Sequence, residues 1–250
     1  KTISALGGYA ATAITAITVQ NTLGVQAVHP VPAELVGEQM QAVMEDLRPD
    51  AIKIGMTGNV EIISEIARLL HQYSPRQVVL DPVMVSTSGH NLMTDEAVEA
   101  ICTLLLPEVS LVTPNLHEAA VLLQQPIHTV DDMEHAAHLV YEKYHCACLV
   151  KGGHLTGNEM CDVLYDGHEL HLFGARRIHS GNLHGTGCTL SSAIATFLAQ
   201  GFPLYEAVEL AKTYITKAIE AGKDLHIGQG NGPLCHFPYL VNPVNPLTEE

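Results

Sequence analysis

The amino-acid sequence predicts an α/β fold with a mostly parallel central sheet, helices on both faces and a hairpin toward one edge. Short apolar stretches alternate with stretches of helical period along almost all of the 250 residues. Several apolar stretches end at a polar residue or a glycine followed by the next helical pattern. This repetition of strands with helices between them is typical of a doubly wound parallel sheet.

The order of the elements follows from the periodicity of apolar residues and from the prolines and glycines that mark where elements begin and end. The first residues resemble the end of a helix that stops at Gly7-Gly8. The residues that follow predict buried strands over Tyr9–Val19, Ala51–Ile54, Val78–Leu80, Leu111–Val112 and Cys148–Val150. Helices are expected over Pro32–Leu47, Val60–Leu70, Thr94–Leu106, the segment after Asn115, Asp131–Tyr144, Thr189–Ala199 and Leu204–Ala221.

Two local signals refine this order. Thr94 is a suitable N-cap for the helix that follows it. Asp162–Tyr165 and Glu169–Phe173, separated by a turn that contains Asp166-Gly167, predict a β-hairpin. We see no internal repeat or linker, so the sequence predicts one domain over residues 1–250.

Composition excludes several classes of partner. The chain has 12 basic and 27 acidic residues, a formal net charge of −15, which argues against nucleic acid and anionic membranes as partners. No run of 18 apolar residues predicts a membrane span, and no signal peptide is recognised. The six cysteines form no C-x-x-C pair, which favours a reduced, cytosolic protein. The 15 histidines invite a metal-storage reading, but they follow no metal-binding motif and fit a solvated surface better.

The ends of the predicted strands are the first place to look for a site, because open α/β sheets bind ligands outside the carboxyl ends of their strands. The residues at these ends are Gln20 and Asn21, Gly55 and Met56, Asp81, Asn115 with Glu118, and Lys151 with Gly152 and Gly153.

A glycine-containing segment, Gly185-Thr186-Gly187-Cys188-Thr189, lies just before a predicted helix. Small residues there allow close approach of a ligand, and free N–H groups at a helix N-terminus favour an anion. An ordinary turn into a helix explains the segment equally well. The helix N-terminus would also lower the pKa of the Cys188 thiol from about 8.5 and favour the thiolate. The alternative is that Cys188 is a small buried apolar residue.

Two acids and two lysines complete the candidate site. Asp81 and Glu118 suit Mg²⁺, which takes one or two carboxylates together with phosphate oxygens and water. For Glu118 alone, an acid in the first turn of a helix is an alternative. Lys151 could reach a phosphate, or could be a solvated lysine at a strand end. Lys212 lies in the last long helix and, taken individually, fits the surface better.

Taken in order, these motifs resemble the ribokinase superfamily, and most closely the hydroxymethylpyrimidine/phosphomethylpyrimidine kinases of thiamine biosynthesis. The resemblance covers essentially the whole chain. Its motifs are residues 13–22, Lys53-Ile54-Gly55-Met56, Val79–Met84, Thr113–Ala119, Val150–His154 and His184–Thr189.

The resemblance implies roles for individual residues. Gln20 and Met56 would contact the pyrimidine ring, and Asp81 and Glu118 would lie on the Mg²⁺ and phosphate side. Lys151 and Lys212 would bind ATP. Gly185, Thr186, Gly187 and Cys188 would form the anion hole, with Cys188 accepting the alcohol proton or orienting the hydroxyl group. Most related sugar kinases have an aspartate where this chain has Cys188.

The resemblance also implies a reaction: transfer of the γ-phosphoryl group of ATP to 4-amino-5-hydroxymethyl-2-methylpyrimidine, and then to its monophosphate. It further implies a homodimer and a missing N-terminal piece. That piece would hold the first strand and an N-terminal substrate loop, to which nothing in this sequence corresponds. The loop Val85–Leu92, with its small residues, could close over the site and exclude water, or could be an ordinary surface loop.

Two alternatives stay open at this point. A pyridoxal kinase of the same superfamily would also phosphorylate a hydroxymethyl group, although related pyridoxal kinases carry a second cysteine where this chain has none between Val83 and Met93. A metabolite-binding protein without activity is the other, and the intact Asp81, Glu118 and Lys151 argue against it.

Overall fold

The computed structural model describes residues 1–84, 93–153 and 159–239 and contains two sheets. The candidate closing loop over Val85–Leu92 lies outside these ranges. The larger sheet has six strands in the order β3-β4-β5-β6-β7-β8. These strands are β3 (Ile52–Ile54), β4 (Val78–Leu80), β5 (Leu111–Val112), β6 (Ala147–Val150), β7 (Glu159–Tyr165) and β8 (Leu170–Arg176).

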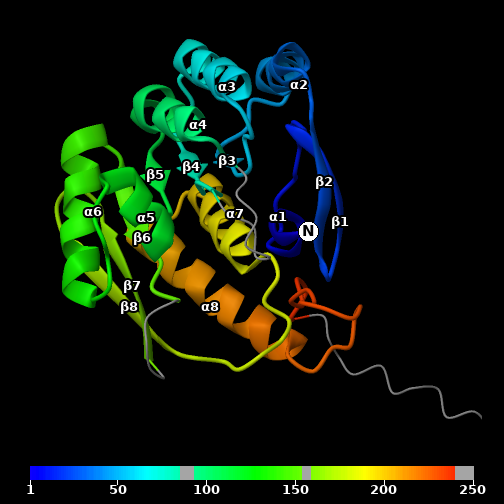
Figure 1. Cartoon of the computed structure of the whole chain (residues 1–250), viewed down its shortest axis with the longest axis vertical. Helices are drawn as coiled ribbons and strands as arrows, with labels where there is room; N and C mark the ends of the chain where they lie inside the picture. Colours follow the sequence, from blue (N-terminus) through cyan, green and yellow to red (C-terminus); the bar gives the residue numbers. More distant parts are fainter. Residues whose placement is uncertain (85–92, 154–158, 240–250) are drawn as a thin grey trace, which may run out of the picture.

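The expected parallel sheet with an edge hairpin is confirmed. Strands β3 to β6 run parallel, whereas β7 is antiparallel to both β6 and β8. Helices lie on both faces of the sheet (Figure 1), as expected from the resemblance to the ribokinase superfamily. These helices are α2 (Ala33–Asp46), α3 (Val60–Tyr73), α4 (Asp95–Ala100), α5 (Leu116–Leu123), α6 (Val130–Tyr144), α7 (Thr186–Ala199) and α8 (Leu204–Gly222).

The two faces of the sheet bury separate cores because side chains alternate along a strand. Val78 and Leu80 of β4 pack with α3 to α6 on one face. Val79, between them, packs with α7 and α8 on the other. The same alternation directs the residue after each buried strand to a defined face, and Asp81 therefore lies on the α7 side.

The prediction of one buried strand over Tyr9–Val19 is wrong. The helix expected to stop at Gly7-Gly8 is present as the short α1 (Thr2–Ala5), but the strand after it begins only at Ala16, as β1 (Ala16–Asn21), and pairs with β2 (Gly24–Pro30) in a separate sheet. Most of β1 is exposed, and Ile17 has an exposed fraction of 63%. This two-stranded sheet stands beside the β3 end of the molecule (Figure 1). A run of β-branched residues therefore predicted a strand correctly but did not determine its burial.

The helix predicted over Thr94–Leu106 is also more irregular than expected. Thr94 does cap α4, since its hydroxyl accepts the N–H of Ala97 at 3.3 Å. After Ala100 the chain continues as a π-helical turn, η1 (Ile101–Leu105), and a 3₁₀ turn, η2 (Leu106–Glu108). No helix of the described part of the chain is long and apolar enough to cross a membrane.

Candidate active site

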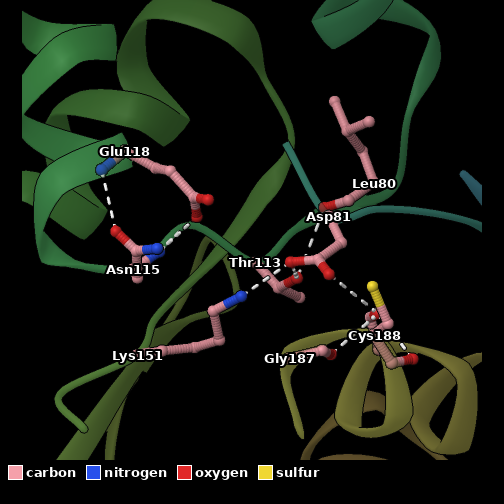
Figure 2. Close-up of polar contacts among 9 residues, drawn as sticks. Leu80, Asp81, Thr113, Asn115, Glu118, Lys151, Gly187 and Cys188 are labelled. Atoms are coloured by element: carbon pink, nitrogen blue, oxygen red, sulfur yellow. Dashed lines mark hydrogen bonds and ion pairs between the residues drawn. The ribbon is translucent and has the colours of Figure 1, made fainter. Parts of the chain in front are cut away.

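A buried ion pair lies at the centre of the candidate site. Lys151 Nζ donates to Asp81 Oδ1 at 2.6 Å, and the two side chains have exposed fractions of only 14% and 3%. Both residues directly follow strands, β6 and β4, and both lie on the α7 face of the sheet. Figure 2 shows Lys151 extending toward Asp81. Two of the strand ends singled out from the sequence therefore lie in contact with each other.

Two hydroxyl groups complete the surroundings of Asp81. Thr113, after β5, donates to Asp81 Oδ1 at 3.3 Å, and Ser191 of α7 lies 3.4 Å from Oδ2. Burial raises the pKa of Asp81, but attraction by Lys151 and Lys53 and the hydrogen bonds to Lys151 and Thr113 outweigh it and leave the pKa below its usual value. Asp81 is therefore a carboxylate at neutral pH.

Helix α7 begins next to this pair. Gly185 is its N-cap with φ of 82°, a left-handed conformation that favours glycine. A Cβ at Gly187 would lie 3.3 Å from Lys151 Nζ and 3.7 Å from Asp81 Oδ2, so the missing side chain allows the helix to approach the pair. The close approach of a ligand to this segment, expected from the sequence, stays a prediction.

One of the backbone N–H groups expected to bind an anion at the start of α7 already has an acceptor. Thr186 N–H donates to the Leu183 carbonyl at 3.3 Å. Gly187 and Cys188 occupy the first turn of α7, where N–H groups have no acceptor within the helix. Thr186 N–H therefore already has an acceptor, whereas Gly187 and Cys188 remain candidate donors to an anion.

Cys188 is exposed and faces Asp81 from the first turn of α7 (Figure 2). The surrounding protein removes hydration that a thiolate would need, and this desolvation, with a smaller contribution from Asp81, raises the pKa of the thiol above its ordinary value. Lys53 and Lys151 oppose the shift without cancelling it. The direction of this shift is opposite to the lowering expected from the helix N-terminus, and it favours the neutral thiol over the thiolate.

Glu118 takes part in a helix cap and also lies near the Lys151–Asp81 pair. It forms a capping box with Asn115: Glu118 Oε2 accepts the Asn115 N–H at 2.8 Å, and Asn115 Oδ1 accepts the Glu118 N–H at 2.9 Å. The carboxyl group also lies close enough to Lys151 and Asp81 to interact electrostatically with both. Burial is the main reason that the pKa of Glu118 is raised. The capping role considered from sequence is therefore confirmed, whereas the role of Glu118 in binding Mg²⁺ and phosphate stays a prediction.

Lys212 lies in a different cluster from Lys151. Its Nζ is 2.5 Å from Asp162 Oδ2 on β7, and Asp162 Oδ1 accepts the N–H of Gly152 at 2.8 Å. The two lysines are therefore linked only indirectly, through Asp162 and the backbone next to Lys151. That Lys212 binds ATP stays a prediction.

The two residues expected to contact the substrate lie at the border of the two sheets. Gln20 Nε2 of β1 is 3.3 Å from His184 Nε2, one residue before Gly185. The Met56 carbonyl, just after β3, accepts the hydroxyl hydrogen of Thr15 at 2.7 Å. Both contacts tie the segment around β1 to the ends of the elements that carry the candidate site.

Sequence reasoning gave no role to three residues of the cluster, Lys53, Thr113 and Ser191. Alternation in β3 puts Lys53 on the face opposite Ile52 and Ile54, which signals a position on the α7 side. Ser191 lies four residues after Gly187, hence on the same face of α7. Both signals were available from the sequence once strand and helix boundaries were known.

Asp81 and Glu118 are the candidate carboxylate donors for Mg²⁺. Two carboxylates at one edge of a sheet fit an ion that otherwise takes phosphate oxygens and water. Some of their oxygens already accept hydrogen bonds from Lys151 and from the Asn115 N–H. No group of three potential metal-binding side chains occurs within residues 1–84, 93–153 and 159–239. Asp81 and Glu118 therefore fit a cation that is also bound by a phosphate ligand, rather than one held by protein side chains alone.

Comparison with known proteins agrees with this geometry. The family model for phosphomethylpyrimidine kinase matches residues 1–235. A hydroxymethylpyrimidine/phosphomethylpyrimidine kinase of Rhizobium meliloti (strain 1021) is 51% identical over 95% of this chain and 89% of its own length.

Solved structures are similar over most of the chain. A phosphomethylpyrimidine kinase from Clostridium difficile 630 is 42% identical, with a TM-score of 0.78 over 87% of this chain and 90% of its own. The pyridoxal kinase from Staphylococcus aureus in complex with AMP-PCP and pyridoxal is 30% identical, with a TM-score of 0.87 over 96% of this chain and 87% of its own.

Proposed function

Because the chain belongs to the phosphomethylpyrimidine kinase family, we propose that it phosphorylates 4-amino-5-hydroxymethyl-2-methylpyrimidine and then its monophosphate, in thiamine biosynthesis. ATP is the proposed phosphoryl donor. The observation that carries the proposal is the buried Lys151–Asp81 pair at the N-terminus of α7. Such a cluster offers a fixed cation and fixed N–H groups to a phosphoryl group in transfer.

Phosphoryl transfer needs positioning and charge stabilisation more than covalent help from the protein. Lys151 remains protonated, because Asp81 and Glu118 raise its pKa against the lowering effect of burial. Its ammonium group would hold the γ-phosphate while the N–H groups of Gly187 and Cys188 receive the charge that develops there. These donors are in place before the substrate binds, so little reorganisation is needed.

Cys188 would orient the acceptor hydroxyl group. A neutral thiol is a poor base, and the raised pKa therefore favours the orienting role over proton abstraction. The carboxylate of Asp81, next to Cys188, would receive the proton or hold the hydroxyl group in line. Asp81 and Glu118 would together hold Mg²⁺, which when bound neutralises charge on the phosphate oxygens.

Gln20 and Met56 would contact the pyrimidine ring, and Lys212 would lie on the nucleotide side. The Gln20 contact to His184 supports this assignment, because it brings Gln20 next to the start of the glycine segment. The contact between the Met56 carbonyl and Thr15 ties Met56 to the segment that leads into β1, the strand that carries Gln20.

The experiment is a coupled assay for ADP release by the purified protein with ATP, Mg²⁺ and the hydroxymethylpyrimidine. Phosphorus NMR of the same mixture should show the monophosphate first and the diphosphate later. ATP consumption that the pyrimidine does not stimulate would contradict the proposal and favour a binding protein without this activity.

A pyridoxal kinase activity is the second candidate, favoured by the TM-score of 0.87 to the Staphylococcus aureus enzyme. The cysteine that related pyridoxal kinases carry is absent between Val83 and Met93, which favours the pyrimidine. Turnover of pyridoxal and of the pyrimidine, measured side by side at equal concentrations, decides between them. We expect the higher kcat/KM with the pyrimidine.

A further inference from the structure

Lys53 is a second cation next to the Asp81 carboxylate, on the opposite side from Lys151. It lies in the middle of β3 and pairs in register with Val79, whose side chain belongs to the core under α7. Ile54 and Ile52, its neighbours in the strand, pack on the other face. The Lys53 side chain therefore lies on the same face of the sheet as Asp81 and Cys188.

The Lys53 ammonium group lies at the carboxyl end of the strand. A Cβ built on Gly55 would lie only 2.6 Å from Lys53 Nζ, so the ammonium occupies the space that a side chain at position 55 would take. The end of β3 is tied to the site, since Asp81 N–H donates to the Ile54 carbonyl at 2.9 Å. Strand pairing thus places Lys53 near Asp81, and the absence of a side chain at Gly55 leaves room for its ammonium group.

The electrostatic effects of Lys53 reach the same two groups as those of Lys151. Both lysines lower the pKa of Asp81 and oppose the rise in the pKa of Cys188. In the sheet order, β3 is on one side of β4 and β6 is on the other. Asp81, at the end of β4, therefore has one lysine on each side.

The two sides have different chemistry under the proposed function. Lys151 is next to Glu118 and the nucleotide side, whereas Lys53 is two residues from Gly55 and three from Met56, the expected contact to the pyrimidine. The first acceptor is a neutral alcohol, but the second is a phosphate monoester with a charge of about −1.5 to −2 at pH 7. Its approach to the γ-phosphate brings two anions together, and a cation on the acceptor side would offset their repulsion.

We propose that Lys53 binds the phosphate group of the phosphorylated acceptor and so permits the second phosphoryl transfer. The proposal rests on the proposed function, since it requires an enzyme that acts on both the alcohol and its monophosphate. It assigns separate tasks to the two lysines: Lys151 holds the donor phosphate in both reactions, and Lys53 holds the acceptor phosphate in the second.

The test is the ratio of kcat/KM for the monophosphate to kcat/KM for the alcohol, at saturating ATP. A lost charge-assisted contact reduces affinity by roughly tenfold to one hundredfold. We therefore expect Lys53→Met to lower the ratio by about 30-fold, beyond any loss that the two reactions share. Lys53→Arg, which retains the charge, should keep the ratio within about threefold of the wild-type value.

Two comparisons make the result unambiguous. Lys151→Met should depress both reactions and leave the ratio within about threefold, because the donor phosphate is common to both. Gly55→Ala, which crowds the Lys53 ammonium, should lower the ratio in the same direction as Lys53→Met, by a smaller factor. It replaces Lys53→Met if circular dichroism shows that the latter does not fold.

A ratio unchanged in both Lys53→Met and Gly55→Ala would overturn the proposal. Failure of the proposed function has a different signature, because the wild-type protein would then fail to convert the alcohol or its monophosphate before any substitution is made.

Discussion

Two buried lysine–aspartate pairs of similar exposure lie on the same side of the sheet and differ in their surroundings. Lys151–Asp81 and Lys212–Asp162 both have lysine side chains with an exposed fraction of 14%. Asp81 is bordered by Thr113, Ser191 and the start of α7. Asp162 instead accepts the Gly152 N–H and so ties the chain after β6 to β7 and α8.

The difference shows that a buried ion pair is not in itself a functional signal. Pairs that tie elements together and pairs that offer charge to a ligand have the same local geometry. The Lys151–Asp81 pair is distinguished by Gly187, which removes the side chain that would separate it from the N–H groups of a helix. The four predictions below test this distinction.

Substitution of the two aspartates should separate catalysis from stability. Asp81→Asn removes the charge that holds Lys151 in place, and we expect kcat to fall by about 10²–10³-fold. Asp162→Asn should reduce kcat by less than about tenfold but lower the free energy of unfolding by about 3 kcal/mol, because Lys212 loses its buried partner. Steady-state kinetics and urea denaturation of both variants provide the comparison. Equal losses of kcat would show that the two pairs are functionally alike.

Substitution of the two lysines should give a smaller contrast. Lys151→Met should lower kcat about 100-fold, since its contact to the phosphate strengthens in the transition state. Lys212→Met should raise KM for ATP by about tenfold with a smaller change in kcat, as expected of a lysine that contributes to nucleotide binding. Titrations of ATP with both variants measure the split. A change only in kcat for Lys212→Met would contradict the expected binding role.

A second capping box, formed by Thr129 and Asp132 at the start of α6, offers a matched control for that of Asn115 and Glu118. Asn115→Ala and Thr129→Ala each remove an N-cap, and each should cost about 1 kcal/mol of stability. Only Asn115 positions an acid of the site, Glu118, so only Asn115→Ala should also reduce kcat/KM, by about threefold to tenfold. Thermal denaturation and kinetics should be measured on the same preparations. Loss of activity in Thr129→Ala would mean that activity follows stability alone.

The pH dependence should report Glu118 rather than Asp81. Glu118 has a raised pKa and Asp81 a lowered one, so Glu118 takes up a proton first as the pH falls. The kcat/KM should decline through a midpoint above 4.5, the ordinary value for this side chain, while Asp81 stays ionised. Profiles of the wild type and of Glu118→Gln over the range in which the protein remains folded measure this. An acid limb that persists unchanged in Glu118→Gln would assign it to another group.

Much of the fold and of the site could be predicted from sequence because both depend on local patterns. Each buried strand is a short apolar run, and the rule that ligands bind at strand ends indicated Asp81, Glu118 and Lys151 without coordinates. The prediction of a buried strand fails for β1, where a run rich in Thr and Ile forms part of an exposed two-stranded sheet. Burial of that run depends on which elements cover it, which no local pattern contains.

The parts of the site that could not be predicted depend on contacts between distant residues. The partner of Lys212 is 50 residues away in sequence, on β7. The pKa of Cys188 was expected to fall because only the helix N-terminus was considered. In the structure, desolvation and the Asp81 carboxylate, 107 positions earlier in the sequence, raise the pKa of Cys188 against the lowering effect of Lys53 and Lys151.

The proposed function depends most directly on where the transferred phosphoryl group binds. A crystal structure of the protein with the hydroxymethylpyrimidine and a non-hydrolysable ATP analogue would locate it. We predict that the γ-phosphate contacts Lys151 Nζ and the N–H groups of Gly187 and Cys188, with the pyrimidine on the side of Gln20 and Met56. A γ-phosphate bound at Lys212 and Asp162, away from the start of α7, would contradict the account.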